Sequence, residues 1–328
     1  MTLALEQWVN HTLNTTATLI PLSGDAGFRR YFRFSHANIP YIAVDASHPT
    51  SSNPAFIFMA EHLRQTGLLA PEVKHVDLTQ GFLVLSDLGD MTFLKYVNEK
   101  NADSLYLQAL KDLVQIQKLT AQVDSQLPTF DDSFILRECG LFHEWFLQIH
   151  LQLELSAATQ QMLQQTYQRL AELIAKQPNV CVHRDYHSRN LMWCEGRLGI
   201  LDFQDAVLGP VTYDVVSLLK DCYIAWPKEQ VQAWALQYLQ WAEEAHVLST
   251  QDPQSFLHDL NIMGVQRHLK AVGIFSRLHW RDNKEHYLKD IPRTLNYVVD
   301  ALKQEPDFAD FYHFLNGVVL PQMQAVNV

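Results

Sequence analysis

Two neighbouring segments decide the fold of this chain: Val182-His183-Arg184-Asp185-Tyr186-His187-Ser188-Arg189-Asn190 and Leu198-Gly199-Ile200-Leu201-Asp202-Phe203-Gln204. Between them, Leu191–Cys194 and Leu198–Leu201 flank Glu195-Gly196-Arg197, a composition typical of a tight β-hairpin turn. Folding the chain back at Gly196 is predicted to bring position 190 level with position 203, so that Asn190 and Asp202 lie side by side. Their amide and carboxylate oxygens are ligands that Mg²⁺ prefers. Asp185 would then lie close enough to orient a hydroxyl group.

The same residues allow two other interpretations. His183, Asp185 and His187 alternate along the chain, as ligands on a metal-binding strand might, so a metallohydrolase is a rival. That interpretation leaves Asn190 unexplained and finds no second cluster of His and Asp. The plainest alternative is an ordinary hairpin with exposed polar loop residues. The complete spacing, with a hairpin between its halves, favours a phosphoryl-transfer site over both.

The spacing resembles the kinase catalytic loop H-R-D-x-x-x-x-N followed by D-F-x. Gly209–Asp214 resembles the G-x-P-x-x-Y-D motif of the aminoglycoside phosphotransferase and choline kinase family, and Phe82–Gly89 resembles its hinge. The likeness runs from about residue 17 to about residue 220. It implies an α+β, bilobal, protein-kinase-like fold that uses ATP and Mg²⁺ to phosphorylate a small-molecule hydroxyl.

Three further segments are similar to a subgroup of that family, the bacterial anomeric kinases of N-acetylmuramate and N-acetylglucosamine. They are Ser23–Arg33, Leu141–Phe146 and Gln266–Leu278. The resemblance implies phosphorylation of the anomeric hydroxyl of these sugars, in cell-wall sugar recycling. The alternatives are an aminoglycoside or amino-alcohol kinase and a catalytically inactive, nucleotide-binding module.

Composition narrows the class of protein. At 328 residues with 48% hydrophobic content, the chain can bury one large core or two modest ones. A formal net charge of −11 argues against a nucleic-acid or anionic-membrane partner, because no basic surplus offsets phosphates. The sequence shows neither a membrane span nor a signal peptide, and its four cysteines lack C-x-x-C spacing. We therefore expect a cytoplasmic protein with a small-molecule substrate; nothing here predicts an oligomeric state.

The order of elements predicts two lobes. Ala17–Leu22, Arg30–Phe34, Tyr41–Ala46 and Phe82–Leu85 are predicted strands, and the chain after Thr92 is mostly helical. A helix is expected from the N-cap Asn53 and Pro54 to a C-terminal cap at Gly67. We place the N-lobe at residues 1–88, for nucleotide binding, and the C-lobe at residues 89–328, for catalysis and substrate binding.

The nucleotide side departs from the kinase pattern. The third strand normally supplies a lysine that pairs with a helix glutamate, but that position holds Asp45, and Glu61 is expected to be solvated. Arg30 or Arg33 is predicted to supply the missing positive charge, with Arg29 less suited because it lies in the turn. The other residues predicted to bind the nucleotide are Gly24 and Gly27, between two strands, and Leu85 and Asp87 at the hinge.

The remaining candidates support the loop or face the acceptor. His183 is expected to pack beneath the loop, and Asp214 to accept hydrogen bonds from loop amides. In the acceptor segment Gln266–Leu278, positive side chains would suit a carboxylate such as the lactyl group of muramate; a solvated basic helix face is the plain alternative. The candidate substrate residues are His187, Asp205, His143, Glu144, Arg267 and Lys270.

Overall fold

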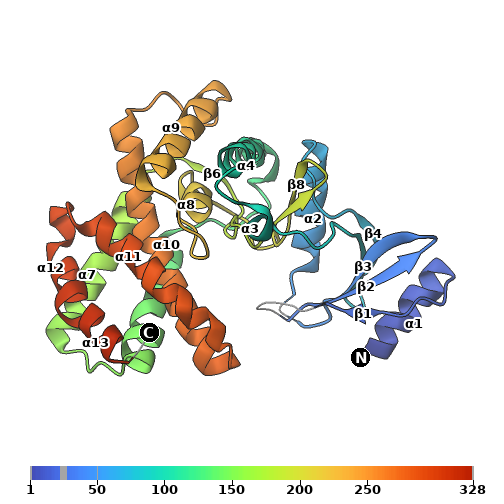
Figure 1. Cartoon of the computed structure of the whole chain (residues 1–328), viewed down its shortest axis with the longest axis horizontal. Coiled ribbons are helices and arrows are strands. Elements are labelled where there is room, and N and C mark those ends of the chain that lie inside the picture. Colours follow the sequence, from blue (N-terminus) through green and yellow to red (C-terminus); the bar gives the residue numbers. More distant parts are fainter. Residues whose placement is uncertain (1, 23–27, 50, 327–328) are drawn as a thin grey trace. The chain divides into compact units, whose positions relative to one another are not determined.

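The computed structural model describes residues 2–22, 28–49 and 51–326, and the chain forms two compact units. The N-terminal unit comprises residues 1–97 and 189–206, and the C-terminal unit comprises residues 98–188 and 207–328. As predicted, the fold is α+β: one part is built on a small sheet and the larger part is mostly helical (Figure 1). The lobe boundary after residue 88 stays a prediction. In the described part of the chain, every helix is too short or too polar to cross a membrane.

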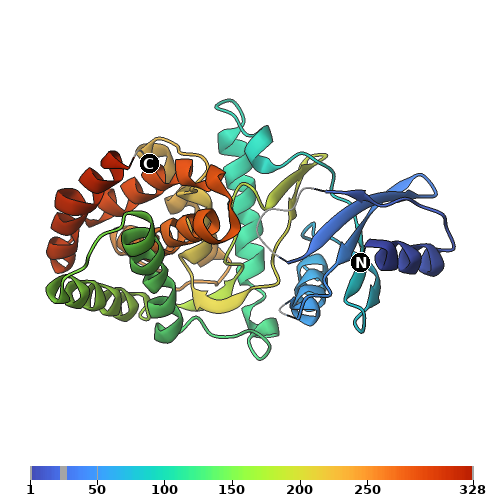
Figure 2. The same cartoon turned by 90° about the horizontal axis from the view of Figure 1, so that it is seen from below.

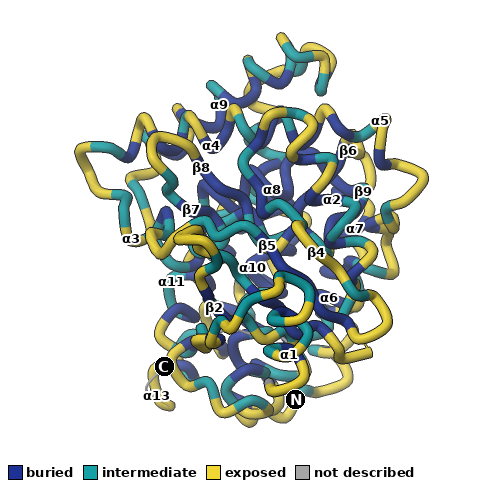
Figure 3. The backbone as a smooth tube through the Cα atoms, turned by 90° about the vertical axis from the view of Figure 1, so that its right-hand side faces the viewer, coloured by how far each residue is buried: buried dark blue, intermediate teal, exposed yellow. Residues whose placement is uncertain are grey.

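Five antiparallel strands form the sheet of the N-terminal unit, in the order β1-β2-β3-β5-β4. Their bounds are Ile20–Pro21 for β1, Arg30–His36 for β2, Ile39–Asp45 for β3, Val73–Asp77 for β4 and Phe82–Ser86 for β5. Four of them fall on the predicted strands. Sequence reasoning missed β4 because it is a polar edge strand, whereas β5 is buried along almost its whole length (Figure 3).

The start of the chain is a helix, α1 (Thr2–Leu13), which the strand-rich prediction for this region missed. Leu5 and Val9, four residues apart on one helix face, are fully buried. They join a cluster with Phe32, Phe34 and other apolar residues of the sheet. α1 therefore lies along one face of the sheet (Figure 2), and that contact, more than the local sequence, accounts for the helix.

The helix α2 (Asn53–Gln65) corrects one predicted cap and confirms another. The N-cap is Ser52, while the buried Asn53 donates its side-chain N–H to the carbonyl of Ala46 at 3.1 Å. Asn53 therefore ties the helix to the chain before it and does not cap the helix. Gly67 follows the last turn with φ of 82°, the left-handed conformation that favours glycine.

The predicted hairpin is present, with a different register. It consists of β7 (Leu191–Cys194) and β8 (Arg197–Ile200), and its turn has two residues, Glu195 and Gly196, both with positive φ. Because this turn is shorter than expected, Asn190 lies level with Leu201, whose N–H donates to the Asn190 carbonyl at 2.9 Å, and not with position 203. The short helix α3 (Phe93–Tyr96) completes the N-terminal unit.

The C-terminal unit is built around the 30-residue helix α10 (Pro253–Asp282), which contacts most of the surrounding helices (Figure 1). The other helices are α4 (Ala102–Gln117), α5 (Thr120–Val123), α6 (Asp132–Leu141), η1 (Phe142–His150), α7 (Ala157–Ile174), α8 (Tyr213–Leu219), α9 (Lys228–Glu244), η2 (Glu285–Asp290), α11 (Ile291–Leu302), η3 (Pro306–Phe308), α12 (Ala309–Phe314), η4 (Leu315–Val319) and α13 (Leu320–Ala325). β6 (Asn179–Val182) pairs with β9 (Val207–Pro210).

A glycine sets how closely α10 approaches its neighbours. A Cβ atom on Gly273 would lie 2.4 Å from the carbonyl carbon of Leu141 and 2.7 Å from the nitrogen of Phe142. These are backbone atoms at the junction of α6 and η1, so they have little freedom to move. Gly273 therefore permits the close contact that holds α10 against α6.

Candidate active site

The loop after β6 carries Asp185, and α8 fixes its start. The buried carboxylate of Asp214 accepts the N–H of His183 at 2.6 Å and the N–H of Arg184 at 3.0 Å, the loop contacts predicted for it. Burial raises the pKa of Asp214 to about 7, against the opposing effect of the two amides. Arg184 has φ of 75°, an uncommon conformation for a residue other than glycine. The loop is thus held in a specific shape.

Three further contacts anchor the rest of this loop. His183 is buried, and its Nδ1 atom accepts the N–H of Asp185 at 3.3 Å, consistent with the structural position predicted for it. The hydroxyl of Tyr186 donates to the carbonyl of Ala109 in α4 at 2.8 Å. The N–H of Ser188 donates to Asp221 at 2.9 Å. The backbone on both sides of Asp185 is therefore fixed by buried groups.

The charges around Asp185 keep it ionised. Burial alone would raise its pKa, but Lys270, His187, Arg184 and Arg267 outweigh burial and lower the pKa to about 2. Asp185 is thus a carboxylate at neutral pH. A carboxylate only accepts hydrogen bonds, which suits a group that orients a hydroxyl.

Glu138 of α6 forms ion pairs with two of these cations, Arg184 and Lys270. The sequence analysis did not predict a role for this glutamate. Its Oε1 atom lies 2.7 Å from Nη2 of Arg184 and 3.3 Å from Nζ of Lys270. Its Oε2 atom accepts a hydrogen bond from Nε2 of Gln266 at 3.0 Å. Lys270 also donates to the hydroxyl of Tyr213 at 2.9 Å. Burial favours a higher pKa for Glu138, but Lys270 and Arg184 hold it below its usual range. No local motif marks this glutamate; only the contact between α6 and α10 reveals it.

The acceptor segment is buried, contrary to the plain alternative of a solvated basic helix face. Arg267 is 6% exposed and Lys270 is 9% exposed, and the helix is buried at every position from 262 to 270. α10 passes through the middle of the unit, so even its charged residues face other elements. Both cations are close enough to lower the pKa of Asp185.

The other predicted acceptor residues lie in different places. His187 packs edge to face against Tyr223, with ring centroids 5.3 Å apart, and helps to lower the pKa of Asp185. On η1, His143 stacks on Tyr167, while Glu144 is exposed. Asp205 belongs to the N-terminal unit, whereas the other candidate acceptor residues belong to the C-terminal unit. Their roles toward a substrate stay predictions.

In the N-terminal unit, the hairpin brings Asn190 and Asp202 together as predicted. Nδ2 of Asn190 lies 3.4 Å from Oδ2 of Asp202. Gln204, which the sequence analysis did not single out, donates to Oδ1 of Asp202 at 2.8 Å and to Asp205 at 3.5 Å. Asp202 has φ of 66°, a conformation that Asp tolerates better than most residues. The amide of Asn190 therefore lies beside the carboxylate of Asp202 at one end of the hairpin.

An aromatic contact ties this end of the hairpin to α2. Phe203 stacks on Phe56, with ring centroids 4.9 Å apart, and the guanidinium of Arg29 lies over the Phe56 ring at 5.3 Å. Burial raises the pKa of Tyr31, and both Arg29 and Asp202 influence it. Arg29, the arginine judged least suited from sequence, therefore lies in the same region as Asp202.

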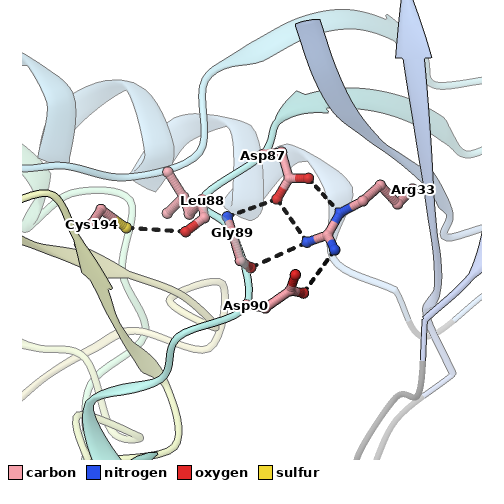
Figure 4. Close-up of polar contacts among 6 residues, drawn as sticks. All are labelled: Arg33, Asp87, Leu88, Gly89, Asp90 and Cys194. Carbon is pink, nitrogen blue, oxygen red and sulfur yellow. Dashed lines mark hydrogen bonds and ion pairs between the residues drawn. The ribbon is translucent and has the colours of Figure 1, made fainter. Parts of the chain in front are cut away.

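Arg30 and Arg33 are engaged elsewhere. Arg30 forms an ion pair with Asp45, the residue at the position of the usual lysine. Arg33 donates from Nε to Asp87 at 2.5 Å, from Nη1 to Asp90 at 2.7 Å and from Nη2 to the carbonyl of Gly89 at 3.2 Å (Figure 4). Asp87 is therefore an anchor for Arg33 through its side chain. The donors of Arg33 thus hold the segment after β5, and its contact with phosphate stays a prediction.

Three other nucleotide-side predictions remain untested. Leu85 is buried in β5, paired with Ile42 of β3, and its contact with a nucleotide stays a prediction. Gly24 and Gly27 lie outside the described residues. Glu61 is exposed and accepts a hydrogen bond from Gln65 at 3.3 Å, in agreement with the solvated position expected for it.

Comparison with known proteins identifies the family. The model of the phosphotransferase enzyme family matches residues 18–253. The chain is 41% identical over 306 residues to the N-acetylmuramate/N-acetylglucosamine kinase of Pseudomonas aeruginosa, covering 93% of this chain and 89% of the relative. It is 38% identical over 308 residues to the protein of the same name from Pseudomonas putida, covering 94% and 89%.

Solved structures agree on the fold. ADP-bound aminoglycoside phosphotransferase APH(2'')-Ib is 16% identical with a TM-score of 0.62, covering 91% of this chain and 98% of that one. Plasmodium vivax ethanolamine kinase is 12% identical with a TM-score of 0.62, covering 89% and 85%. The family resemblance and the fold predicted from the catalytic-loop motifs are confirmed. The chain belongs to the phosphotransferase enzyme family.

Proposed function

We propose that this protein transfers the γ-phosphoryl group of ATP to the anomeric hydroxyl of N-acetylmuramate or N-acetylglucosamine. The observation that carries the proposal is the 41% identity, over 93% of the chain, to a relative named for both sugars. The site residues are consistent with this chemistry. Because ATP is kept inside cells, we propose a cytoplasmic location, and a role in recycling cell-wall sugars.

Asp185 is the proposed catalytic residue. Its carboxylate accepts the hydrogen bond of the sugar hydroxyl and aims the oxygen at the γ-phosphorus. As the new P–O bond forms, the bond from the γ-phosphorus to the bridging oxygen breaks, ADP leaves, and the hydroxyl proton passes to the carboxylate. With a pKa of about 2, Asp185 is a weak base, so its main contribution is orientation.

Asn190 and Asp202 are the proposed ligands of Mg²⁺. They fit this ion by ligand type, because the amide of Asn190 lies beside the exposed carboxylate of Asp202, with Nδ2 3.4 Å from Oδ2, and Mg²⁺ prefers amide and carboxylate oxygens. When bound, the ion would offset charge on the phosphates. Gln204 holds one oxygen of Asp202 and so orients the carboxylate.

For the nucleotide, we propose Arg29 as a phosphate ligand in addition to the predicted candidates Arg30 and Arg33. Arg29 lies over Phe56, which stacks on Phe203 next to Asp202, whereas Arg30 is paired with Asp45. The backbone near Leu85 and Asp87, and the Gly24 and Gly27 segment, remain the proposed contacts for the adenine and the phosphates.

The test is an ATP-consumption assay with a panel of acceptors. The panel contains N-acetylmuramate, N-acetylglucosamine, the 1-O-methyl glycoside of each sugar, and kanamycin. Turnover of the free sugars, with none of the methyl glycosides, is the expected result. Turnover of kanamycin alone would identify an aminoglycoside kinase, and ATP binding without turnover of any acceptor would identify an inactive module.

A further inference from the structure

Three cations, Arg184, Arg267 and Lys270, lie in the C-terminal unit near Asp185, and two of them share one counter-ion. Arg184 and Lys270 contact the same oxygen of Glu138 at 2.7 and 3.3 Å. Lys270 also donates to Tyr213. Because the buried carboxylate and the hydroxyl already engage these cations, neither offers a full set of donors to a ligand.

Arg267 differs from both. It is 6% exposed, yet within the described ranges no carboxylate oxygen lies within ion-pair distance of it. Its one hydrogen bond runs from Nη1 to the sulfur of Cys222 at 3.7 Å, and its buried Nε has no partner among the described residues. A guanidinium carries five N–H donors, and a buried one is almost always paired. Most of the binding capacity of Arg267 is therefore unused.

The helix geometry explains why Arg267 stays apart. Gln266 and Lys270 are four residues apart on α10, so they share the face that contacts Glu138. Arg267 is one residue on and points instead toward Cys222, which follows α8. It remains close enough to Asp185 for each charge to shift the pKa of the other. Arg267 thus lies near the proposed catalytic carboxylate without neutralising it by contact.

We propose that Arg267 binds the carboxylate of N-acetylmuramate and determines the use of this sugar relative to N-acetylglucosamine. The inference rests on the proposed function. The planar guanidinium matches a carboxylate by two parallel hydrogen bonds, which a lysine cannot provide. The lactyl ether of N-acetylmuramate is on C3, with one ring carbon between C3 and the anomeric C1. Its carboxylate must therefore be bound within one sugar ring of Asp185.

The experiment compares both sugars in the wild type and in Arg267→Gln. Hydrogen bonds to charged groups contribute about 1.5–3 kcal/mol, so we expect KM for N-acetylmuramate to rise about 10- to 100-fold. KM for N-acetylglucosamine, which has no carboxylate, should change by less than about threefold. Arg267→Lys keeps the positive charge but lacks the planar pair of N–H donors. Its KM for N-acetylmuramate should therefore lie between those of the wild type and Arg267→Gln. Arg293→Gln is the matched control, because Arg293 also contacts Cys222, through the carbonyl at 2.8 Å, but already lies beside Asp290.

A second comparison changes the substrate, so it does not depend on a variant that folds. The amide of N-acetylmuramate keeps the lactyl group without its charge. The wild type should lose about 10- to 100-fold in kcat/KM on going from the acid to the amide, and Arg267→Gln should lose little.

The outcomes separate this inference from the function on which it rests. Equal losses for both sugars in Arg267→Gln, or an unchanged wild-type rate with the amide, would overturn the inference and leave the sugar kinase in place. A wild type that phosphorylates N-acetylglucosamine but not N-acetylmuramate would also overturn it. A wild type that phosphorylates neither sugar would refute the proposed function itself.

Discussion

Replacing Glu138 with glutamine tests how the C-terminal unit balances its buried charges. The substitution keeps the shape of the side chain but removes the negative charge shared by Arg184 and Lys270. Solvent offers little screening, since the three side chains are 7%, 17% and 11% exposed. Breaking a buried ion pair from one side costs roughly 3–5 kcal/mol. Asp185 can accept one of the released cations, so we expect about 3 kcal/mol of lost stability.

Urea unfolding followed by tryptophan fluorescence measures this loss directly. Activity should fall as well, because Arg184 or Lys270 would turn toward Asp185 and compete with the sugar hydroxyl for its carboxylate. A barrier increase of about 1.4 kcal/mol or more lowers kcat about tenfold or more. Glu144→Gln, at an exposed position on the adjoining helix η1, is the matched control and should change stability by less than about 0.5 kcal/mol. If the free energy of unfolding of Glu138→Gln were within about 1 kcal/mol of the wild-type value, the account of Glu138 as a shared counter-ion would be wrong.

The remaining predictions concern the helix contact, pH and the metal. Gly273→Ala should lose about 1–3 kcal/mol or more in urea unfolding, because the new Cβ collides with backbone, whereas Gly317→Ala has open space and should be neutral. The folded pKa of Asp185, about 2, lies below its usual 3.8, so its stabilising contribution is present above pH 3.8 and lost as the pH falls toward 2. Between pH 3.8 and pH 2, the free energy of unfolding of the wild type should therefore fall by roughly 2 kcal/mol more than that of Asp185→Asn. Equal losses in the two proteins would contradict the charge assigned to Asp185. Asp202→Asn should raise the Mg²⁺ concentration for half-maximal activity by about tenfold or more, with Glu195→Gln as an unaffected control; an unchanged Mg²⁺ requirement would exclude Asp202 as a ligand.

Local sequence was sufficient for features that depend on short-range geometry. Glu195-Gly196 marks the hairpin because two residues with positive φ form its turn, and that turn brings Asn190 and Asp202 together. Gly67 ends α2 for a similar reason. The predicted register, with Asn190 level with position 203, was wrong by two positions because the sequence alone did not fix the number of residues in the turn.

Features that depend on tertiary contact were missed or misplaced. Glu138 has no motif around it, and its importance arises only where α6 meets α10. Packing inside the unit likewise buries Arg267 and Lys270 of α10, which an amphipathic pattern would leave in water. The partners of Arg33, Asp87 and Asp90, are distant in sequence, so these ion pairs are visible only in the folded chain.

The strand-rich prediction for the start of the chain likewise missed the helix α1. α1 is a helix because Leu5 and Val9 are buried against the sheet, and that sheet forms from strands later in the chain. Intrinsic preference is a weak guide where tertiary packing decides the conformation.

The most direct test of the central claim is the single-turnover rate of Asp185→Asn with ATP and N-acetylglucosamine. If Asp185 orients the sugar hydroxyl, the rate should fall by about 10²- to 10⁴-fold while ATP affinity stays within about threefold of the wild type. A variant that transfers phosphate at the wild-type rate would contradict the account.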